Sequence, residues 1–259
     1  MEDTLRLFAP ITLEEMSGIR LMNRTDTKFV TTRAMLERLL QMARDDYYAQ
    51  TIDGSRMHAY YTVYFDTPDY NMYTVHETGH TNRQKLRVRS YVDSHQSFLE
   101  VKTKNNRGRT KKKRMALDDF NPEDSSAFNV QSANYEDFLH EHLRYDPMTL
   151  SRQLENRFDR ITLVNKGKTE RLTIDTNLRF HNIATDKRQF MDDVVIIELK
   201  RDGLVHSPIL HMLRDLRIKP HGFSKYVIGS ALTNGQLRCN RMKPKLADIQ
   251  RLLHSNKEQ

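Results

Sequence analysis

Charged and apolar residues alternate along three short segments of this chain, Lys85–Arg89, Phe98–Lys104 and Ile196–Lys200. Residues two apart in a strand point to the same face, so each segment predicts a strand with one charged and one apolar face. The charged faces carry Arg87 and Arg89, then Glu100, Lys102 and Lys104, then Glu198 and Lys200. Guanidinium and ammonium groups bind phosphate oxygens, and carboxylates suit Mg²⁺ or Mn²⁺. Closed on one another, these faces would form a cationic hole for a polyanion and a divalent metal.

The overall composition fits an anionic partner without identifying it. The chain has 259 residues, 37% of them hydrophobic, and a formal net charge of +8. This length allows one large domain or two small ones, and no break in composition separates two. On charge alone, nucleic acid, membrane phosphate and polyphosphate all remain open as partners. A charge of this size is also typical of an ordinary soluble surface.

Cysteine content and hydropathy limit the cellular compartments in which we expect the protein. Cys239 is the only cysteine, which excludes disulfide scaffolds and cysteine-rich zinc sites. The first 25 residues contain no basic segment followed by an apolar run. No stretch approaches the roughly 18 consecutive apolar residues of a membrane-spanning helix. The sequence therefore predicts a cytoplasmic protein with no transmembrane segment.

Short strands linked as hairpins make up most of the expected structure. We expect strands over residues 24–30, 59–66, 84–92, 97–104, 110–117, 157–164, 170–178 and 194–200. We expect helices over residues 11–17, 32–45, 133–144, 147–153, 208–217, 224–234 and 245–253. Strands and helices do not alternate regularly, so the pattern predicts an α+β fold with an antiparallel eight-stranded barrel and flanking helices. A barrel of about eight strands can hold a ligand inside.

A series of motifs resembles the VTC domain, the catalytic domain of the vacuolar transporter chaperone polyphosphate polymerase, in its bacterial, stand-alone form. The motifs are Arg24–Phe29, Tyr64–Thr67, Arg87–Arg89, Glu100–Thr103, Lys112–Arg114, Phe158–Arg160, Arg171–Asp175, Glu198–Lys200 and Phe223–Tyr226. The resemblance runs from about residue 5 to residue 235 and implies a triphosphate tunnel metalloenzyme, an antiparallel tunnel lined with Lys, Arg and Glu. We expect one tunnel domain over residues 1–237 and a basic, helical tail over 238–259.

The resemblance also implies roles for individual residues. Phosphate-binding roles are expected for Lys28, Arg87, Arg89, Lys102, Lys112, Arg160, Arg171 and Lys225, and further substrate contacts for Lys104, Arg114, Lys200 and Ser224. Glu198 is the expected metal ligand, and Glu100 is either a second ligand or a carboxylate that orders its cationic neighbours. The implied cofactor is Mn²⁺ or Mg²⁺. The implied partners are polyphosphate and ATP or another nucleoside triphosphate.

Two positions depart from the family pattern, and some residues have simpler interpretations. Family members often carry an additional lysine where this chain has Gly222, and a tyrosine where it has Phe158. The run Lys111–Arg114 could be a solvated edge strand, since lysines there discourage aggregation. The pair Ser224–Lys225 could be a helix cap followed by a surface lysine.

The resemblance implies a metal-dependent polyphosphate polymerase that transfers the γ-phosphoryl group of ATP to a growing chain inside the tunnel. Two alternatives remain open, a triphosphate hydrolase that uses the same tunnel and a non-catalytic module that binds polyphosphate. A nucleic-acid-binding protein is disfavoured. Its basic residues should form an exposed stripe with aromatic residues, whereas these alternate on faces that look inward.

Overall fold

A curved antiparallel sheet dominates the computed structural model, which describes residues 1–19, 24–203 and 205–255. Eight strands follow one another in the order β2 (Arg24–Thr32), β11 (Val194–Asp202), β9 (Glu170–Asn182), β8 (Ser151–Asn165), β4 (His58–Asp66), β5 (Arg83–Tyr91), β6 (Gln96–Lys104) and β7 (Thr110–Leu117). Three short strands attach to the side of this path, β1 (Ala9–Ile11), β3 (Tyr47–Gln50) and β10 (Arg188–Met191).

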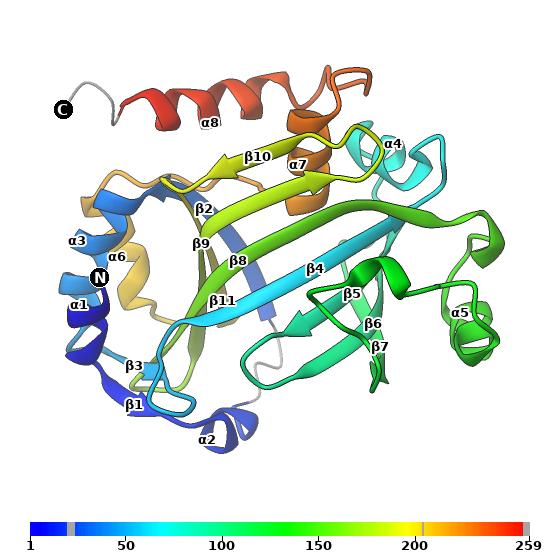
Figure 1. Ribbon diagram of the computed structural model, residues 1–259. Helices are drawn as coiled ribbons and strands as arrows, with labels where there is room; N and C mark the ends of the chain where they lie inside the picture. Colours follow the sequence, from blue (N-terminus) through cyan, green and yellow to red (C-terminus); the bar gives the residue numbers. More distant parts are fainter. Residues whose placement is uncertain (20–23, 204, 256–259) are drawn as a thin grey trace.

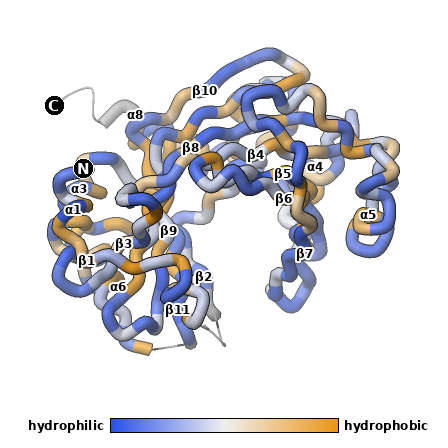
Figure 2. The backbone as a smooth tube through the Cα atoms, turned by 60° about the horizontal axis from the view of Figure 1, so that its bottom comes forward, coloured by the Kyte–Doolittle hydropathy of each residue, from blue (hydrophilic) through white to orange (hydrophobic). Residues whose placement is uncertain are grey.

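The sheet bends into an arch with β2 and β11 on one limb and β7 on the other (Figure 2). The α+β fold with eight antiparallel strands, expected from the sequence, is confirmed. Among the described strands no pairing joins β2 to β7, so the arch is curved without being a hydrogen-bonded ring.

Helices pack around this arch. They are α1 (Glu2–Arg6), α2 (Leu13–Ser17), α3 (Arg33–Ala43), α4 (Asn71–Glu77), α5 (Glu136–His142), α6 (Pro208–Asp215), α7 (Lys225–Thr233) and α8 (Lys243–Ser255), with single 3₁₀ turns η1 (Ser125–Ala127), η2 (Ala133–Tyr135) and η3 (Pro147–Thr149). Helices α1, α3 and α6 lie together on one side of the arch (Figure 1), and α8 contacts β2 and β11. Polar caps start several of these helices; Thr32, for example, accepts a hydrogen bond from the Met35 amide at the start of α3.

The apolar strand faces form the core on the outside of the arch. One cluster packs α3 and α6 against β8, β9 and β11 and includes Leu36, Ile174 and Leu199. Another packs the segment between β7 and β8 against β5 and β6 and includes Val88 and Leu99. Because side chains alternate along a strand, burial of these residues turns the charged residues between them toward the inside of the arch.

Helix α7 is the exception, because it packs inside the arch. Its residues Tyr226 and Val227 join a buried cluster with Tyr64, Phe158 and Ile196, which lie on the same strand faces as the charged residues. The inside of the arch is therefore apolar where α7 packs against the strands and charged in the neighbouring region that α7 does not cover.

The structure corrects the helix expected over residues 147–153. Only a single turn, η3, forms there, and strand β8 begins at Ser151. The buried residues Leu150 and Leu154 are four apart, which resembles a helical repeat. Pairing with β4, which aligns Asp66 with Ser151, extends the strand instead. Helix α4 and the short strands β1, β3 and β10 were not expected from the sequence.

Candidate active site

Strand register aligns the charged residues of β5, β6 and β7 in rows across one limb of the arch. The rows are Arg87, Glu100 and Arg114, then Lys85, Lys102 and Lys112. Residues in register on neighbouring strands point to the same face. The alternation seen in each segment of the sequence therefore becomes a continuous charged surface in the fold.

Glu100 is the counter-charge of this limb. Its side chain is fully buried, at 0% exposed, and both carboxylate oxygens are paired. Arg87 donates to Oε2 through Nη2 at 2.6 Å and Nε at 2.8 Å, and Lys112 donates to Oε1 at 2.8 Å. Burial alone would raise the pKa of Glu100, but the charges of Arg87, Arg89 and Lys112 outweigh it and hold that pKa at about 2. Glu100 is thus a permanent anion that fixes two cations.

Glu198 occupies the facing limb. It pairs in register with Lys28 of β2, and Lys200 follows two residues later on the same face. Its Oε2 lies 3.2 Å from the Lys200 ammonium, and its Oε1 lies 3.8 Å from the Lys28 ammonium, beyond hydrogen-bonding distance. Burial alone would raise the pKa of Glu198, but the charges of Lys28, Lys200 and Lys102 lower it by more than burial raises it, so the carboxylate is ionised. Unlike Glu100, Glu198 is still 19% exposed.

Lys102 links the two limbs electrostatically. Lys102 is exposed by its accessible surface, yet the protein around it partly desolvates the ammonium and lowers its pKa to about 8, and repulsion from Lys28 of β2 and Arg87 of β5 adds to the effect. Glu198 of β11 opposes this change. Groups from strands at opposite ends of the path therefore act on one side chain, so the charged faces of the two limbs look toward each other.

A third group of charges lies beside α7. Asp175 of β9 is buried and accepts hydrogen bonds from Arg160 Nε at 2.6 Å and Nη2 at 2.9 Å, and also pairs with Lys225. Burial lowers the pKa of Lys225 to about 7, with Asp175 opposing and Arg160 reinforcing the effect. The Lys225 ammonium lies 4.2 Å from the centre of the Phe158 ring. At the position where the family often has a tyrosine, this chain therefore has a ring face that contacts a cation.

The remaining predicted residues line the same inner faces at different depths. Arg89 is buried beside the rings of Tyr60 and Phe158. Arg114 is exposed and lies over the Phe98 ring at 4.4 Å. Lys104 pairs in register with Arg83, and Arg171 with Lys200.

Two residues of this surface were not assigned roles from the sequence. Lys85 donates from Nζ to Ser224 Oγ at 2.8 Å, while the same hydroxyl caps α7 by accepting from the Val227 amide. Burial lowers the pKa of Lys85, and Lys102 and Lys28 reinforce the effect. Lys85 lies two residues before Arg87 and so on the same strand face, and this spacing could have identified it from the sequence. Asp175 was part of a quoted motif, but its pairing with Arg160 depends on the register between β8 and β9, which no single strand shows.

Comparison with known proteins agrees with this geometry. The profile of the VTC domain matches residues 23–234. The chain belongs to the VTC domain family. A search of curated proteins gave no significant match.

Solved structures similar to this VTC domain show the same fold at low sequence identity. A candidate adenylate cyclase from Bacillus halodurans is 15% identical with a TM-score of 0.51, over 78% of this chain and 96% of that one. The candidate adenylyl cyclase HpAC1 from Hippeastrum, described as having a dominant triphosphatase activity, is 14% identical with a TM-score of 0.54, over 85% of this chain and 99% of that one. None of the helices among the described residues combines the length and the hydropathy of a membrane-spanning segment.

The residues of this VTC domain fit a metal that is bound together with phosphate. Among the described residues no three or more His, Cys, Asp or Glu side chains gather into a metal site. Mg²⁺ and similar ions are commonly held by one or two carboxylates with phosphate oxygens and water completing the shell. Glu198 provides one partly exposed, ionised carboxylate, and Asp26 lies on the same strand face opposite Lys200. Glu100, with both oxygens already paired, fits this role poorly.

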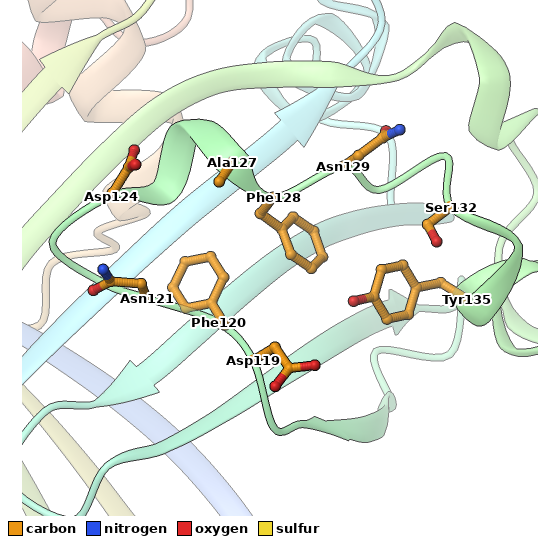
Figure 3. Close-up of a pocket in the computed structure, with 9 residues that line it drawn as sticks. All are labelled: Asp119, Phe120, Asn121, Asp124, Ala127, Phe128, Asn129, Ser132 and Tyr135. Carbon is orange, nitrogen blue, oxygen red and sulfur yellow. The ribbon is translucent and has the colours of Figure 1, made fainter.

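A separate pocket of about 230 Å³ lies on the other side of the sheet (Figure 3). Its lining includes the rings of Phe120, Phe128 and Tyr135 and the carboxylates of Asp119 and Asp124, but no cation. The three rings pack against the apolar outer faces of β5 and β6. This pocket lacks the charge that a phosphate ligand needs and belongs to the outer core.

Proposed function

We propose that this VTC domain is a metal-dependent polyphosphate polymerase that transfers the γ-phosphoryl group of ATP to a polyphosphate chain held inside the arch. The observation that carries the proposal is the pair of charged inner faces. One limb carries the in-register rows of β5, β6 and β7, and the other carries Lys28 and Lys200 with the carboxylate of Glu198 between them. Charges brought together from opposite ends of a sheet need a ligand of opposite sign that can contact both limbs.

The charge balance of the site supports a polyanion over a single small anion. Lys85, Lys102 and Lys225 all have lowered pKa values, because the surrounding protein desolvates their ammonium groups and neighbouring cations repel them. The inner carboxylates Glu100 and Asp175 are each paired with two cations. A chain of phosphates passing between the limbs would supply negative charge to all of these cations at once.

The transfer needs no nucleophilic side chain. A terminal oxygen of the polyphosphate chain forms a bond to the γ-phosphorus of ATP, and the bond from that phosphorus to the β–γ bridging oxygen breaks. The electron pair stays on the β-phosphate, and ADP leaves. Arg87, Lys102 and Arg160 would hold both phosphate groups in line and stabilise the charge on the equatorial oxygens.

We assign the metal to Glu198, with Asp26 as the second candidate ligand, and the ordering of cations to Glu100. A bound Mn²⁺ or Mg²⁺ would act as a Lewis acid and reduce the negative charge that the phosphates present to the attacking oxygen. The chain's own contribution is to keep Glu198 ionised and partly exposed, while Glu100 holds Arg87 and Lys112 in position.

The test is to incubate the purified protein with ATP and Mn²⁺ and to measure ADP, free phosphate and polyphosphate on a stained gel. Long chains formed with matching ADP are the expected result. Phosphate release without chains would instead identify a hydrolase, the alternative favoured by the shared fold with the Hippeastrum protein described as a triphosphatase. Binding of polyphosphate without turnover would leave a binding module.

A further inference from the structure

The pocket on the outer side of the sheet is lined by three aromatic rings that pack against one another (Figure 3). The centre of the Phe128 ring lies 5.4 Å from that of Phe120 and 5.2 Å from that of Tyr135. These three residues are only partly buried, whereas Tyr61 and Phe65, whose rings they contact, are each 2% exposed. The core therefore fixes the rings of the pocket while part of their surface stays open to a ligand.

The size and the chemistry of the pocket suit a single cationic side chain. Its volume of about 230 Å³ lies below the roughly 300–1,000 Å³ of pockets that hold drug-sized ligands. The face of an aromatic ring attracts a cation, and arginine makes this contact more often than lysine. The chain itself does so beside the pocket, where the Arg157 guanidinium lies 4.5 Å from the centre of the Tyr61 ring, which stacks on Phe120. At the Tyr135 end of the same row of rings, no Lys or Arg of the described residues lines the pocket.

Negative charge surrounds this pocket although the chain as a whole is basic. Residues 115–143, which include the whole lining, contain seven Asp or Glu and no Lys or Arg, in a chain of net charge +8. Asp119 lines the pocket and is exposed, and among the described residues none forms an ion pair or hydrogen bond with its carboxylate. Partial burial raises the pKa of Tyr135, and the charge of Asp119 adds to the effect, so the two groups lie close together. A cation in the pocket would therefore meet a ring and a carboxylate without a partner.

The wall formed by the turn η1 is anchored to the sheet. Ser125 is 5% exposed, and its hydroxyl accepts a hydrogen bond from Tyr61 of β4 and donates one to Glu155 of β8. Asp124, the second carboxylate of the lining, caps this turn by accepting hydrogen bonds from the amide and hydroxyl of Ser126. The pocket is therefore preformed, with Asp124 committed to its wall.

We propose that this pocket binds an arginine side chain from a basic segment of a partner protein. The guanidinium group stacks on the rings of Phe128 and Tyr135 and donates hydrogen bonds to the carboxylate of Asp119. The occupant is a peptide segment rather than a free amine, because acidic residues continue past the pocket into α5, at Glu136 and Asp137, where they attract further cations. The rings pack against the outer faces of β5 and β6, so the partner leaves the inside of the arch open to phosphate.

The experiment measures, by fluorescence anisotropy, the binding of a short labelled Gly-Ser peptide that carries several arginines. Ionic strength is fixed, and nucleotide and phosphate are absent, so the result does not depend on the proposed polymerase. The control peptide carries citrulline in place of arginine, which keeps the shape of the side chain and removes its charge. The arginine peptide should bind at least about tenfold more tightly than the citrulline peptide, because only its side chain is a cation.

Matched variants locate the binding site. Asp119→Asn should weaken binding of the arginine peptide about threefold to fivefold and leave the urea midpoint unchanged, because the residue is exposed. Tyr135→Leu keeps an apolar side chain, removes the ring and should weaken binding by a similar factor. Glu141→Gln removes the same charge from the same acidic segment at a side chain that is 75% exposed and outside the pocket lining. It should change the affinity less than about twofold.

Three results would overturn the proposal. Equal affinity for the arginine and citrulline peptides, or no binding of either, would show that the pocket does not recognise a guanidinium group. Equal weakening by Asp119→Asn and Glu141→Gln would show that the acidic segment attracts cations through its overall charge and not through the pocket. Binding of N-acetylarginine amide as tightly as the peptide would make the ligand a small cation instead of a partner protein.

Discussion

Glu100→Gln removes the buried charge that orders one limb of the arch. Glu100 is fully buried, and its pKa is lowered from 4.5 to about 2. That lowering corresponds to about 3 kcal/mol of interaction favouring the carboxylate. Removing one partner of a buried ion pair costs about 3–5 kcal/mol, because it leaves an uncompensated charge. We therefore expect the free energy of unfolding at pH 7 to fall by about 3 kcal/mol.

Urea unfolding of the ligand-free protein measures this change, with Glu136→Gln as the control. Glu136 is exposed on α5, so its neutralisation should change stability by less than about 0.5 kcal/mol. The pH dependence provides a second readout. Because the folded pKa of Glu100 is depressed, its contribution is complete above pH 4.5 and is lost as the pH falls toward about 2. The gap between wild type and Glu100→Gln should close over that range. A loss at pH 7 no larger than that of Glu136→Gln would refute the reasoning.

Three further predictions follow from the site and the core. Glu198→Gln should lower metal-dependent turnover of ATP at least about a hundredfold while triphosphate still binds without metal; full activity would show that the metal lies elsewhere. Triphosphate affinity, measured by calorimetry at constant ionic strength, should fall as the pH rises through about 8, because the Lys102 ammonium loses its proton. In Lys102→Arg the affinity should depend less on pH in this range, because arginine stays charged. If the variant has the same pH profile as the wild type, Lys102 does not contact the triphosphate. Gly229→Ala should destabilise the protein by about 1–3 kcal/mol, because its Cβ would lie 2.5 Å from Phe180 Cδ1, whereas Gly18→Ala, with no contact below 3.8 Å, should not; equal urea midpoints would contradict the packing inside the arch.

The strand alternation was sufficient to predict which residues share a face. Arg87, Glu100, Lys102 and Glu198 lie on the faces expected for them, because alternation is a property of each strand alone. The alternation within a strand does not predict which strands pair or in what register. The ion pair of Arg160 with Asp175 arises from the register of β8 with β9, which shifts at a bulge between residues 157 and 159.

Other features depend on contacts between distant segments. The spacing of Leu150 and Leu154 fits a helix locally, and only pairing with β4 makes that segment a strand. Likewise, the sequence shows Gly222 as a missing side chain, whereas the fold brings Lys245 to the same place from a helix 23 residues later.

The most direct test of the account is a crystal structure of the protein with tripolyphosphate and Mn²⁺, with the metal located by its anomalous scattering. The account predicts phosphates between the two limbs, in contact with Arg87, Lys102 and Arg160, and manganese bound to Glu198. Phosphate bound on the outer face of the sheet, or manganese bound away from Glu198, would contradict it.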